Sequence, residues 1–371
     1  MIPLYGRELG GGMTMIGLLW TFYSLPRAVA NPLFGYLSDL FGARKNFVSF
    51  GLISSGILFL TIPLVGMFLA FVALRGLQGI ALSATNPVAS SLASHEKGKE
   101  GRGKALGLYD TARTAGGSIG PAVVGFLIGS YGFLPSFAFS GCCTILAGIL
   151  VYFTISADYG PAQKERERWN VRIDLKYLSE RTKRGIMATV KSPVFPFLVL
   201  ITLRFIGRHA YSRFIPIYFQ DIGFDEGIIG LIRSFRSGMT ALVMIASGVA
   251  ADRLGRRPLI LFAVFCAAME PFLLYWKPNL WQTFLIFAVG SMGWGAFIPA
   301  ARAVVGDLTP VADRGKAYGS MGSAMLLGIS IGPLIGGQIA DAFSYRLDLL
   351  ISSAFLGLIL LLFFVFLQET L

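Results

Sequence analysis

The residues best suited to chemistry are arginines that lie inside long apolar stretches of the chain. An arginine at the centre of a membrane helix costs roughly 2.5–3.5 kcal/mol, so nine facing lipid would cost on the order of 20–30 kcal/mol. Most must therefore face a wet cavity, pair with an acid or extend to the membrane surface. The nine are Arg27, Arg75, Arg113, Arg204, Arg208, Arg213, Arg233, Arg236 and Arg302, and no lysine accompanies them.

Two pairs of arginines place like charges together. Arg204 and Arg208 are four residues apart and Arg233 and Arg236 are three apart, so each pair shares one helix face. Like charges repel unless an anion, an acid or backbone carbonyls lie between them. Because the guanidinium fork binds carboxylates and phosphates bidentately, one interpretation is an anion site. The other is helix packing or anchoring at the membrane surface. The candidate binding residues are Arg27, Arg75, Arg204, Arg208, Arg233 and Arg236.

Acids are scarce at the same depth. Asp110 and Glu270 are the only acids that we place deep within apolar stretches. Asp110 lies three residues before Arg113 on one helix face, which predicts an ion pair between them. Coupling to protons needs a group that titrates, so Asp110 and Glu270 are the first candidates, ahead of His209.

The elements that must position these side chains are membrane-spanning helices. The chain has 371 residues, of which 54% are hydrophobic and 14% charged, whereas soluble domains carry roughly 25% charged residues. Apolar stretches such as Phe133–Ile155 and Leu349–Leu367 reach the length of about 20 residues that a spanning helix needs. The short alternating segments of a β-barrel do not occur. The sequence predicts an all-α polytopic membrane protein.

The sequence contains no cluster of residues with the spacing of a metal-binding or catalytic site. Cys142, Cys143 and Cys266 lie in apolar segments without ligand spacing, and two histidines are too few for a metal cluster. No glycine-rich loop with the lysine that holds nucleotide phosphates occurs. We therefore expect neither an enzyme nor an ATP-driven pump, and no cofactor.

The chain repeats itself at a near-constant offset. Ile2-Pro3-Leu4-Tyr5 returns as Ile215-Pro216-Ile217-Tyr218 at offset 213, and Arg102-Gly103-Lys104-Ala105 returns as Arg314-Gly315-Lys316-Ala317 at offset 212. Two like halves in an apolar chain are typical of transporters. We expect an N-terminal bundle over 1–155, a cytoplasmic basic linker over 156–192 and a C-terminal bundle over 193–371.

Eleven full spans and the stub of another helix are expected. The stub covers residues 1–5, and the spans cover about 12–37, 46–64, 67–92, 104–130, 133–155, 193–219, 227–250, 257–277, 279–304, 316–342 and 346–368. Ile2 aligns with Ile215, so Pro193–Arg213 has no partner in the first half. We expect a matching helix upstream of Met1, through truncation or a start assigned at an internal methionine.

Charge orients the spans in the membrane. One set of connections carries twenty basic residues and the other set three, which places the first set in the cytoplasm. The C-terminus then also lies in the cytoplasm, and the expected location is the plasma membrane. A net charge of +12 needs no nucleic-acid partner, because these loops lie against anionic membrane lipid.

One loop motif occurs in both halves and resembles the most characteristic signature of the major facilitator superfamily. Its residues are Gly35, Asp39, Gly42 and Arg44, repeated as Gly248, Asp252, Gly255 and Arg257. The resemblance covers essentially the whole chain and implies two six-helix bundles that alternate access to a central path. In the family each Asp faces the start of a helix across the domain interface, which implies Asp39 near residue 316 and Asp252 near residue 104. The first copy departs at Leu40 and Ala43, where the second has Arg253 and Arg256.

Two further motifs resemble those of proton-coupled exporters in this family. Gly116, Gly120 and Pro121 match the helix-5 motif associated with antiporters, and Arg75 with Gly76 and Gly79 matches the helix-4 arginine motif linked to proton coupling. The glycine motif has a twin at Gly328, Gly332 and Pro333, so packing is an equally good explanation for it.

The function that follows is secondary active transport of a small-molecule substrate by a monomer, with protons as the coupling ion. We expect a proton-coupled efflux antiporter with an anionic or amphiphilic substrate. The alternative is a transporter of organic anions or phosphorylated metabolites, which the arginine surplus favours. A non-transporting receptor on the same fold is a second alternative, although the very short outer loops speak against it.

Overall fold

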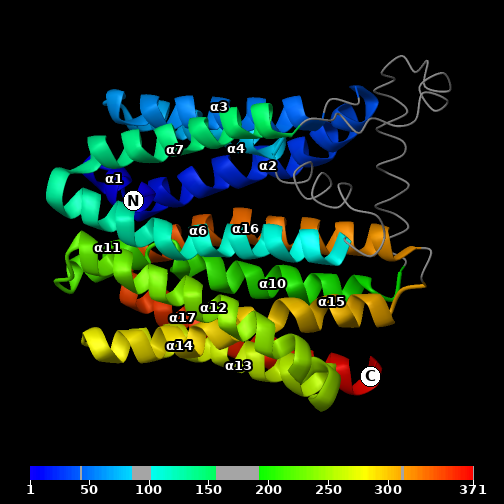
Figure 1. Ribbon diagram of the computed structural model, residues 1–371. Helices are drawn as coiled ribbons and strands as arrows, with labels where there is room; N and C mark the ends of the chain where they lie inside the picture. Colours follow the sequence, from blue (N-terminus) through cyan, green and yellow to red (C-terminus); the bar gives the residue numbers. More distant parts are fainter. Residues whose placement is uncertain (42–43, 86–101, 156–191, 311–312, 371) are drawn as a thin grey trace. The chain divides into compact units, whose positions relative to one another are not determined.

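The computed structural model describes residues 1–41, 44–85, 102–155, 192–310 and 313–370. Every regular element in these ranges is a helix (Figure 1). In chain order they are α1 (Ile2–Glu8), α2 (Met13–Phe41), α3 (Arg44–Thr61), the 3-10 helix η1 (Ile62–Leu64), α4 (Phe68–Ser83), α6 (Arg102–Tyr131), α7 (Phe133–Thr154), α10 (Phe195–Ser212), α11 (Ile215–Asp221), α12 (Glu226–Leu254), α13 (Arg256–Leu274), α14 (Leu280–Gly295), α15 (Phe297–Asp307), α16 (Arg314–Ala342) and α17 (Tyr345–Thr370).

The sequence repeat is a repeat of helices. An offset of 213 carries both ends of α1 onto α11 and both ends of α2 onto α12. An offset of 212 carries both ends of α4 onto α14. The helix α10 precedes the point at which the repeat begins. The prediction of an all-α fold from two like halves is confirmed.

Most predicted spans are single α-helices, but two are divided into two α-helices each, and the span over 46–64 ends in the 3-10 helix η1. The span predicted over 193–219 consists of α10 and α11, and the one over 279–304 consists of α14 and α15. Proline explains both breaks, because it lacks the N–H that would continue the helix. Pro216 stands at the start of α11. Pro299 leaves the carbonyl of Gly295 without its helical donor, and Ser247 Oγ donates to that oxygen at 2.9 Å.

Seven helices in the described ranges are long and apolar enough to cross a membrane. They are α3 with η1, α7, the first part of α12, α13, α14 with α15, α16 and α17. The other predicted spans, α2, α4, α6 and α10, are helical but shorter or more polar, since they carry arginines or many glycines. The part of the predicted span 67–92 that follows Thr85 lies outside the described residues.

The chain divides into two compact units. Unit 1 comprises Met1–Thr21, Thr114–Ser130 and Thr189–Leu371, and unit 2 comprises Phe22–Arg113 and Tyr131–Ala188. The predicted linker over 156–192 falls almost wholly outside the described residues and stays a prediction.

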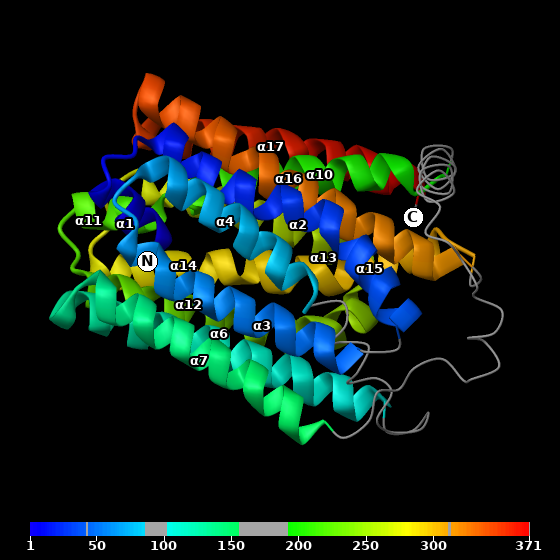
Figure 2. The same ribbon diagram turned by 90° about the horizontal axis from the view of Figure 1, so that it is seen from above.

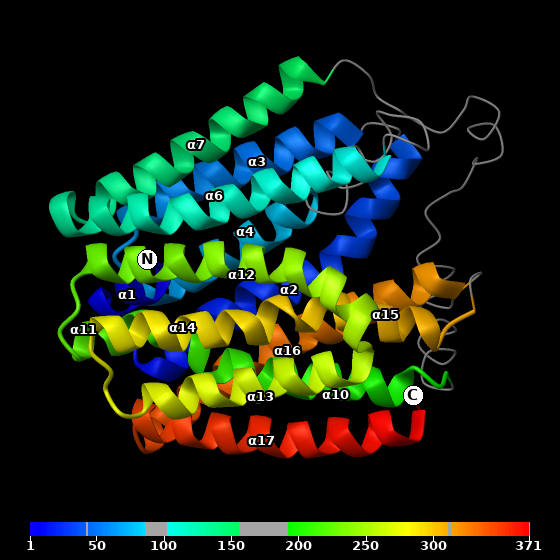
Figure 3. The same ribbon diagram turned by 60° about the horizontal axis from the view of Figure 1, so that its bottom comes forward.

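Within unit 1, α10 packs against α16 and α17, and α13 packs against α14 and α17 (Figures 2 and 3). Glycines on α16 let the backbones of α16 and α10 approach closely. A Cβ at Gly328 would lie 2.7 Å from the Thr202 carbonyl oxygen, and one at Gly332 would lie 2.6 Å from that of Ile206. A Cβ at Gly336 would overlap the backbone of Ala210. This stripe of small residues therefore fixes the position of α10.

The start of α2 is also held by α16. The Asp341 carboxylate accepts hydrogen bonds from the backbone N–H groups of Met13 at 2.9 Å and Thr14 at 2.8 Å. These N–H groups have no partner within their own helix, and the positive end of the helix dipole favours the negative charge. Gly17 lies against the Pro333 carbonyl, with no room for a Cβ. The contact therefore anchors the first turns of α2 on α16.

Glycines also let neighbouring helices approach closely in unit 2. α3 packs along α7, where a Cβ at Gly56 would meet the Gly141 carbonyl oxygen at 2.7 Å. Gly79 of α4 lies against the carbonyl of Tyr23 on α2. The rings of Phe71 and Phe137 are fully buried in this unit.

The two copies of the glycine motif differ in their surroundings. Gly332 of α16 is packed against α10, whereas nothing in the described residues lies within 4 Å of a Cβ added at Gly120, its repeat equivalent on α6. Gly332→Ala should therefore destabilise the protein by about 1–3 kcal/mol through overpacking. Gly120→Ala should be neutral or slightly stabilising, because alanine favours a helix. Thermal unfolding of the purified protein in detergent measures both, and equal effects of the two substitutions would contradict the packing described.

Candidate functional site

Three polar side chains of α10 form one face of that helix. Arg204, Arg208 and Tyr211 are spaced by four and three residues, so they lie above one another on the helix surface. All three are buried, with 0%, 6% and 0% of their surfaces exposed. Burying guanidinium groups is costly unless each finds partners, so the contacts of this face decide what it does.

Glu270 of α13 is the acid at the centre of this face. Arg208 donates from Nη1 to Glu270 Oε2 at 2.9 Å and to the Tyr211 hydroxyl, also at 2.9 Å. Arg236 of α12 approaches the same carboxylate with both terminal nitrogens, Nη1 to Oε1 at 2.9 Å and Nη2 to Oε2 at 3.0 Å. Glu270 is fully buried. One carboxylate thus joins three helices through two ion pairs.

A glycine makes room for the carboxylate. A Cβ at Gly290 of α14 would overlap Glu270 Oε2 and the carbon that carries it. Any larger residue at position 290 would push Glu270 away from its arginines. The rings of Trp294 and Phe287 cover the other side, with the Arg208 Cζ 5.5 Å from the Trp294 centroid and the Arg236 Cζ 4.8 Å from that of Phe287. Stacking on aromatic rings adds to the stability of the two cations.

Arg204 lies one turn away and has a different set of partners. Its Nη2 donates to the Gly293 carbonyl at 2.6 Å, and its Cζ lies 3.7 Å from the centre of the Phe297 ring. Its Nε and Nη1 have no hydrogen-bond partner among the described residues. With Arg208, Arg236 and Glu270, three guanidinium groups accompany one carboxylate. The cluster therefore carries a surplus of positive charge and unused donors.

A second arginine cluster lies in unit 2. Arg75 of α4 is 3% exposed and donates to Gln78 Oε1, and Gln78 Nε2 in turn donates to Ser55 Oγ at 3.4 Å. The Arg75 Cζ stacks 4.2 Å from the Tyr23 ring centroid. Arg27 donates to the Tyr23 hydroxyl at 3.0 Å. Two of the predicted binding arginines thus meet at one tyrosine.

The other predicted residues have more varied surroundings. Arg233 is half-buried, and Arg113 lies in an exposed part of α6. Arg44 and Arg257 are half-buried, and Gly255 turns the chain between α12 and α13 with a φ of 86°, which only glycine adopts readily. No described atom lies within 4 Å of a Cβ added at Gly35. Five more predicted residues, or their side chains, lie outside the described part of the structure, and what we predicted of them stays a prediction. They are Asp39, Gly42, Asp110, Gly248 and Asp252.

Several residues of the two clusters were not predicted. Tyr211, Gly290 and Tyr23 are ordinary residues of apolar helices in the sequence, and only the approach of neighbouring helices gives them a role. Asp348 is a further buried acid that the sequence analysis did not single out. It is fully buried in the first turn of α17, with Ser352 Oγ 3.4 Å from its Oδ1. The sequence could have indicated this acid, because Asp348 lies within the predicted span 346–368.

The described residues form a polytopic helical membrane protein with buried charged clusters. The model of the Major Facilitator Superfamily matches residues 1–225 and 197–370. The chain belongs to the major facilitator superfamily, as its loop motifs predicted.

Similar proteins include named drug exporters. The chain is 28% identical over 364 residues to the multi-drug resistance efflux pump PmrA of Streptococcus pneumoniae, covering 93% of this chain and 85% of that protein. It is 24% identical over 357 residues to the multidrug resistance protein MdtG of Salmonella paratyphi C, covering 93% and 84%. Among solved structures, the nucleoside transporter NupG matches with a TM-score of 0.78 at 11% identity, over 98% of this chain and 94% of that one. The inward-open xylose transporter XylE from E. coli matches with a TM-score of 0.68 at 18% identity, over 95% and 86%.

Gly290→Ala tests the placement of Glu270. The added methyl group must displace the carboxylate from Arg208 and Arg236, so we expect a loss of about 1–3 kcal/mol in the free energy of unfolding. Gly319→Ala on α16 is the matched control, because nothing described lies within 4 Å of its Cβ and the gain in helix propensity is the same. Thermal unfolding in detergent compares the two. Indistinguishable melting temperatures would contradict the position of Glu270.

Proposed function

We propose that the chain is a proton-coupled efflux antiporter for amphiphilic compounds, with Glu270 as the group that carries the proton. The observation that carries the proposal is the buried Glu270 carboxylate, held by Arg208 and Arg236. The names of PmrA and MdtG support export of several compounds as the transport class. The protein acts as a monomer in the plasma membrane, with its C-terminus in the cytoplasm.

The ion pairs supply a switch between two protonation states. While Glu270 is ionised, it neutralises Arg208 and Arg236 and holds α10, α12 and α13 together. A proton on Glu270 removes that attraction and leaves two buried cations facing each other, which favours a rearrangement of these helices. Alternating access then exposes the carboxylate in turn to the two sides of the membrane, so that proton entry drives the return step of the cycle.

The aromatic rings beside the cluster suit an amphiphilic substrate. Phe297 and Phe287 are buried against Arg204 and Arg236, and Trp294 is half-buried against Arg208. Flat apolar faces bind compounds of many shapes by dispersion and stacking, whereas the charged groups fix their orientation. We propose that the substrate contacts Trp294, the most accessible of these rings.

Transport of an organic or phosphorylated anion is the second candidate, and the unused donors of Arg204 favour it. An anion that pairs with Arg204 and Arg208 would displace Glu270 from its ion pair. The displaced carboxylate would then take up a proton, so that anion and proton bind together. In antiport, by contrast, substrate and proton compete, so binding of the substrate must release a proton.

Reconstituted proteoliposomes test the role of Glu270. With an imposed proton gradient, Glu270→Gln should lower gradient-driven transport of a fluorescent amphiphilic dye at least tenfold. Exchange of labelled for unlabelled dye without a gradient should continue, because it needs no change of protonation. Glu226→Gln is the matched control, since Glu226 Oε1 only accepts a hydrogen bond from Gln220 at 3.1 Å near the surface. Equal loss of both activities, or none, would contradict coupling through Glu270.

Proton release on substrate binding separates the two candidates. In weakly buffered detergent solution, an antiporter releases protons when dye binds, whereas displacement of Glu270 by an anion takes protons up. If anions are the substrate, Arg204→Ala and Arg208→Ala abolish that uptake and anion transport with it. Anion transport unaffected by both substitutions would rule out the second candidate.

A further inference from the structure

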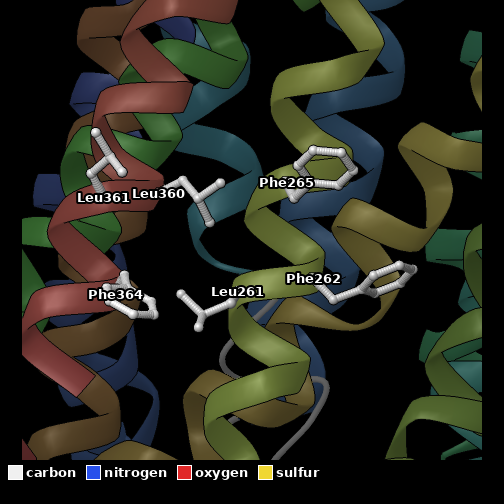
Figure 4. A pocket seen from close by; sticks show the side chains of 6 residues that line it. All are labelled: Leu261, Phe262, Phe265, Leu360, Leu361 and Phe364. Atoms are coloured by element: carbon white, nitrogen blue, oxygen red, sulfur yellow. The ribbon is translucent and has the colours of Figure 1, made fainter. Parts of the chain in front are cut away.

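An apolar groove lies on the surface of unit 1 between α13 and α17. It has a volume of about 470 Å³ and is lined by Leu261, Phe262 and Phe265 of α13 and by Leu360, Leu361 and Phe364 of α17. Figure 4 shows Leu261, Leu360 and Phe364 extending into the space between the two helices. Both helices are long and apolar enough to cross a membrane, so the groove opens towards lipid.

In the described part of the first half, a glycine contact closes the equivalent place. At the equivalent place, Gly148 of α7 lies against α3, where its Cβ would be 2.8 Å from the Ile53 side chain. The repeat places Leu360 at the position of Gly148 and Met269 at that of Gly56. Leu360 lines the groove, whereas glycines let α3 and α7 meet closely. Nearer the start of α17, α13 and α17 also meet, where Ser353 Oγ donates to the Ala268 carbonyl at 2.9 Å. The groove therefore follows from residues that differ between the two copies.

An arginine stands at one end of the groove. Arg257 lies in the first turn of α13, and its Cζ is 5.2 Å from the centroid of the Phe364 ring, which lines the groove. Arg257, Leu261 and Phe265 are four residues apart and lie on one face of α13. At a rise of 1.5 Å per residue the face extends about 12 Å from the arginine, close to the ~15 Å depth of one hydrocarbon leaflet.

More positive charge lies at the same end. Arg256 pairs with Asp307 at 3.0 Å, and Arg253 is exposed at the end of α12. The proposed orientation places this loop at the cytoplasmic surface, where anionic lipids attract basic residues. The apolar lining of the groove suits an acyl chain, and the guanidinium of Arg257 at its end suits the phosphate of the same lipid.

We propose that this groove binds an acidic phospholipid of the cytoplasmic leaflet, with one acyl chain between α13 and α17 and its phosphate at Arg257. The guanidinium recognises the phosphate through paired hydrogen bonds, and this contact selects an acidic headgroup over a zwitterionic one. The site lies on the outer surface of unit 1, apart from the Glu270 cluster. A bound lipid would contact both α13 and α17 along the groove.

Native mass spectrometry of the full chain in detergent tests the proposal with phosphatidylglycerol and phosphatidylcholine as probes. The wild-type protein should retain phosphatidylglycerol at least fivefold more than phosphatidylcholine. Leu360→Trp and Leu261→Trp fill the groove from its two sides, and each should lower retention about tenfold. Arg257→Gln should keep a bound lipid but lose the preference for phosphatidylglycerol.

The control substitutions are matched to these changes. Leu285→Trp alters an exposed leucine of α14, and Arg302→Gln removes an exposed arginine of α15. Both should leave retention and preference unchanged. Unchanged retention in both groove-filling variants, or an unchanged preference in Arg257→Gln, would overturn the proposal. So would a dimer that the groove-filling variants dissociate, because the groove would then hold a second copy of the chain.

Discussion

The structure of unit 1 depends on how buried positive charge is compensated. A carboxylate with no partner in an apolar interior is costly, and so is each guanidinium, but Glu270 with Arg208 and Arg236 satisfies all three from three different helices. The approach of α14 is part of the same arrangement, since only glycine at position 290 leaves room for the carboxylate. Removing one charge therefore affects the packing of four helices at once, which is the property expected of a transport switch.

The repeat determines the arrangement of the helices, whereas the ion-paired cluster and the apolar groove arise from residues that differ between its two copies. α16 is packed against α10 through Gly328, Gly332 and Gly336, whereas no described atom lies within 4 Å of a Cβ added at Gly116 or Gly120, the equivalents of Gly328 and Gly332 on α6. The ion-paired cluster and the apolar groove both lie in the second half. Glu270 corresponds by the repeat to Ile57, a leucine-sized apolar residue, so the first half cannot form the same ion pair. Its own cluster uses Tyr23 and Gln78 around Arg75 instead.

The sequence was sufficient for the fold and for many of the candidate residues, but not for their pairing. Hydrophobic length, the offset of the repeat and the loop motifs are visible in the sequence, and they predicted the helices and the family, whereas charge within apolar stretches made Arg208 and Glu270 candidates. Which arginine meets which acid depends on the rotation and approach of separate helices, so the partnership of Arg236 with Glu270 was not predictable. Gly290 illustrates the same limit, because a glycine in an apolar helix gives no sign of the group that it admits. The breaks at Pro216 and Pro299 were visible in the sequence, yet apolar length outweighed them.

Arg208 and Glu270 stabilise each other inside unit 1 if their ion pair holds α10 against α13. A double-mutant cycle measures this directly, using the free energy of unfolding in mixed micelles for Arg208→Gln, Glu270→Gln and the double variant. Each single substitution should be destabilising, and the double variant should be more stable than the sum of the two effects predicts by about 2 kcal/mol or more. Glu270→Gln leaves Arg208 and Arg236 facing each other without their acid, and the second substitution removes one of these two cations. Additive effects, with a coupling energy below about 0.5 kcal/mol, would contradict this mutual stabilisation.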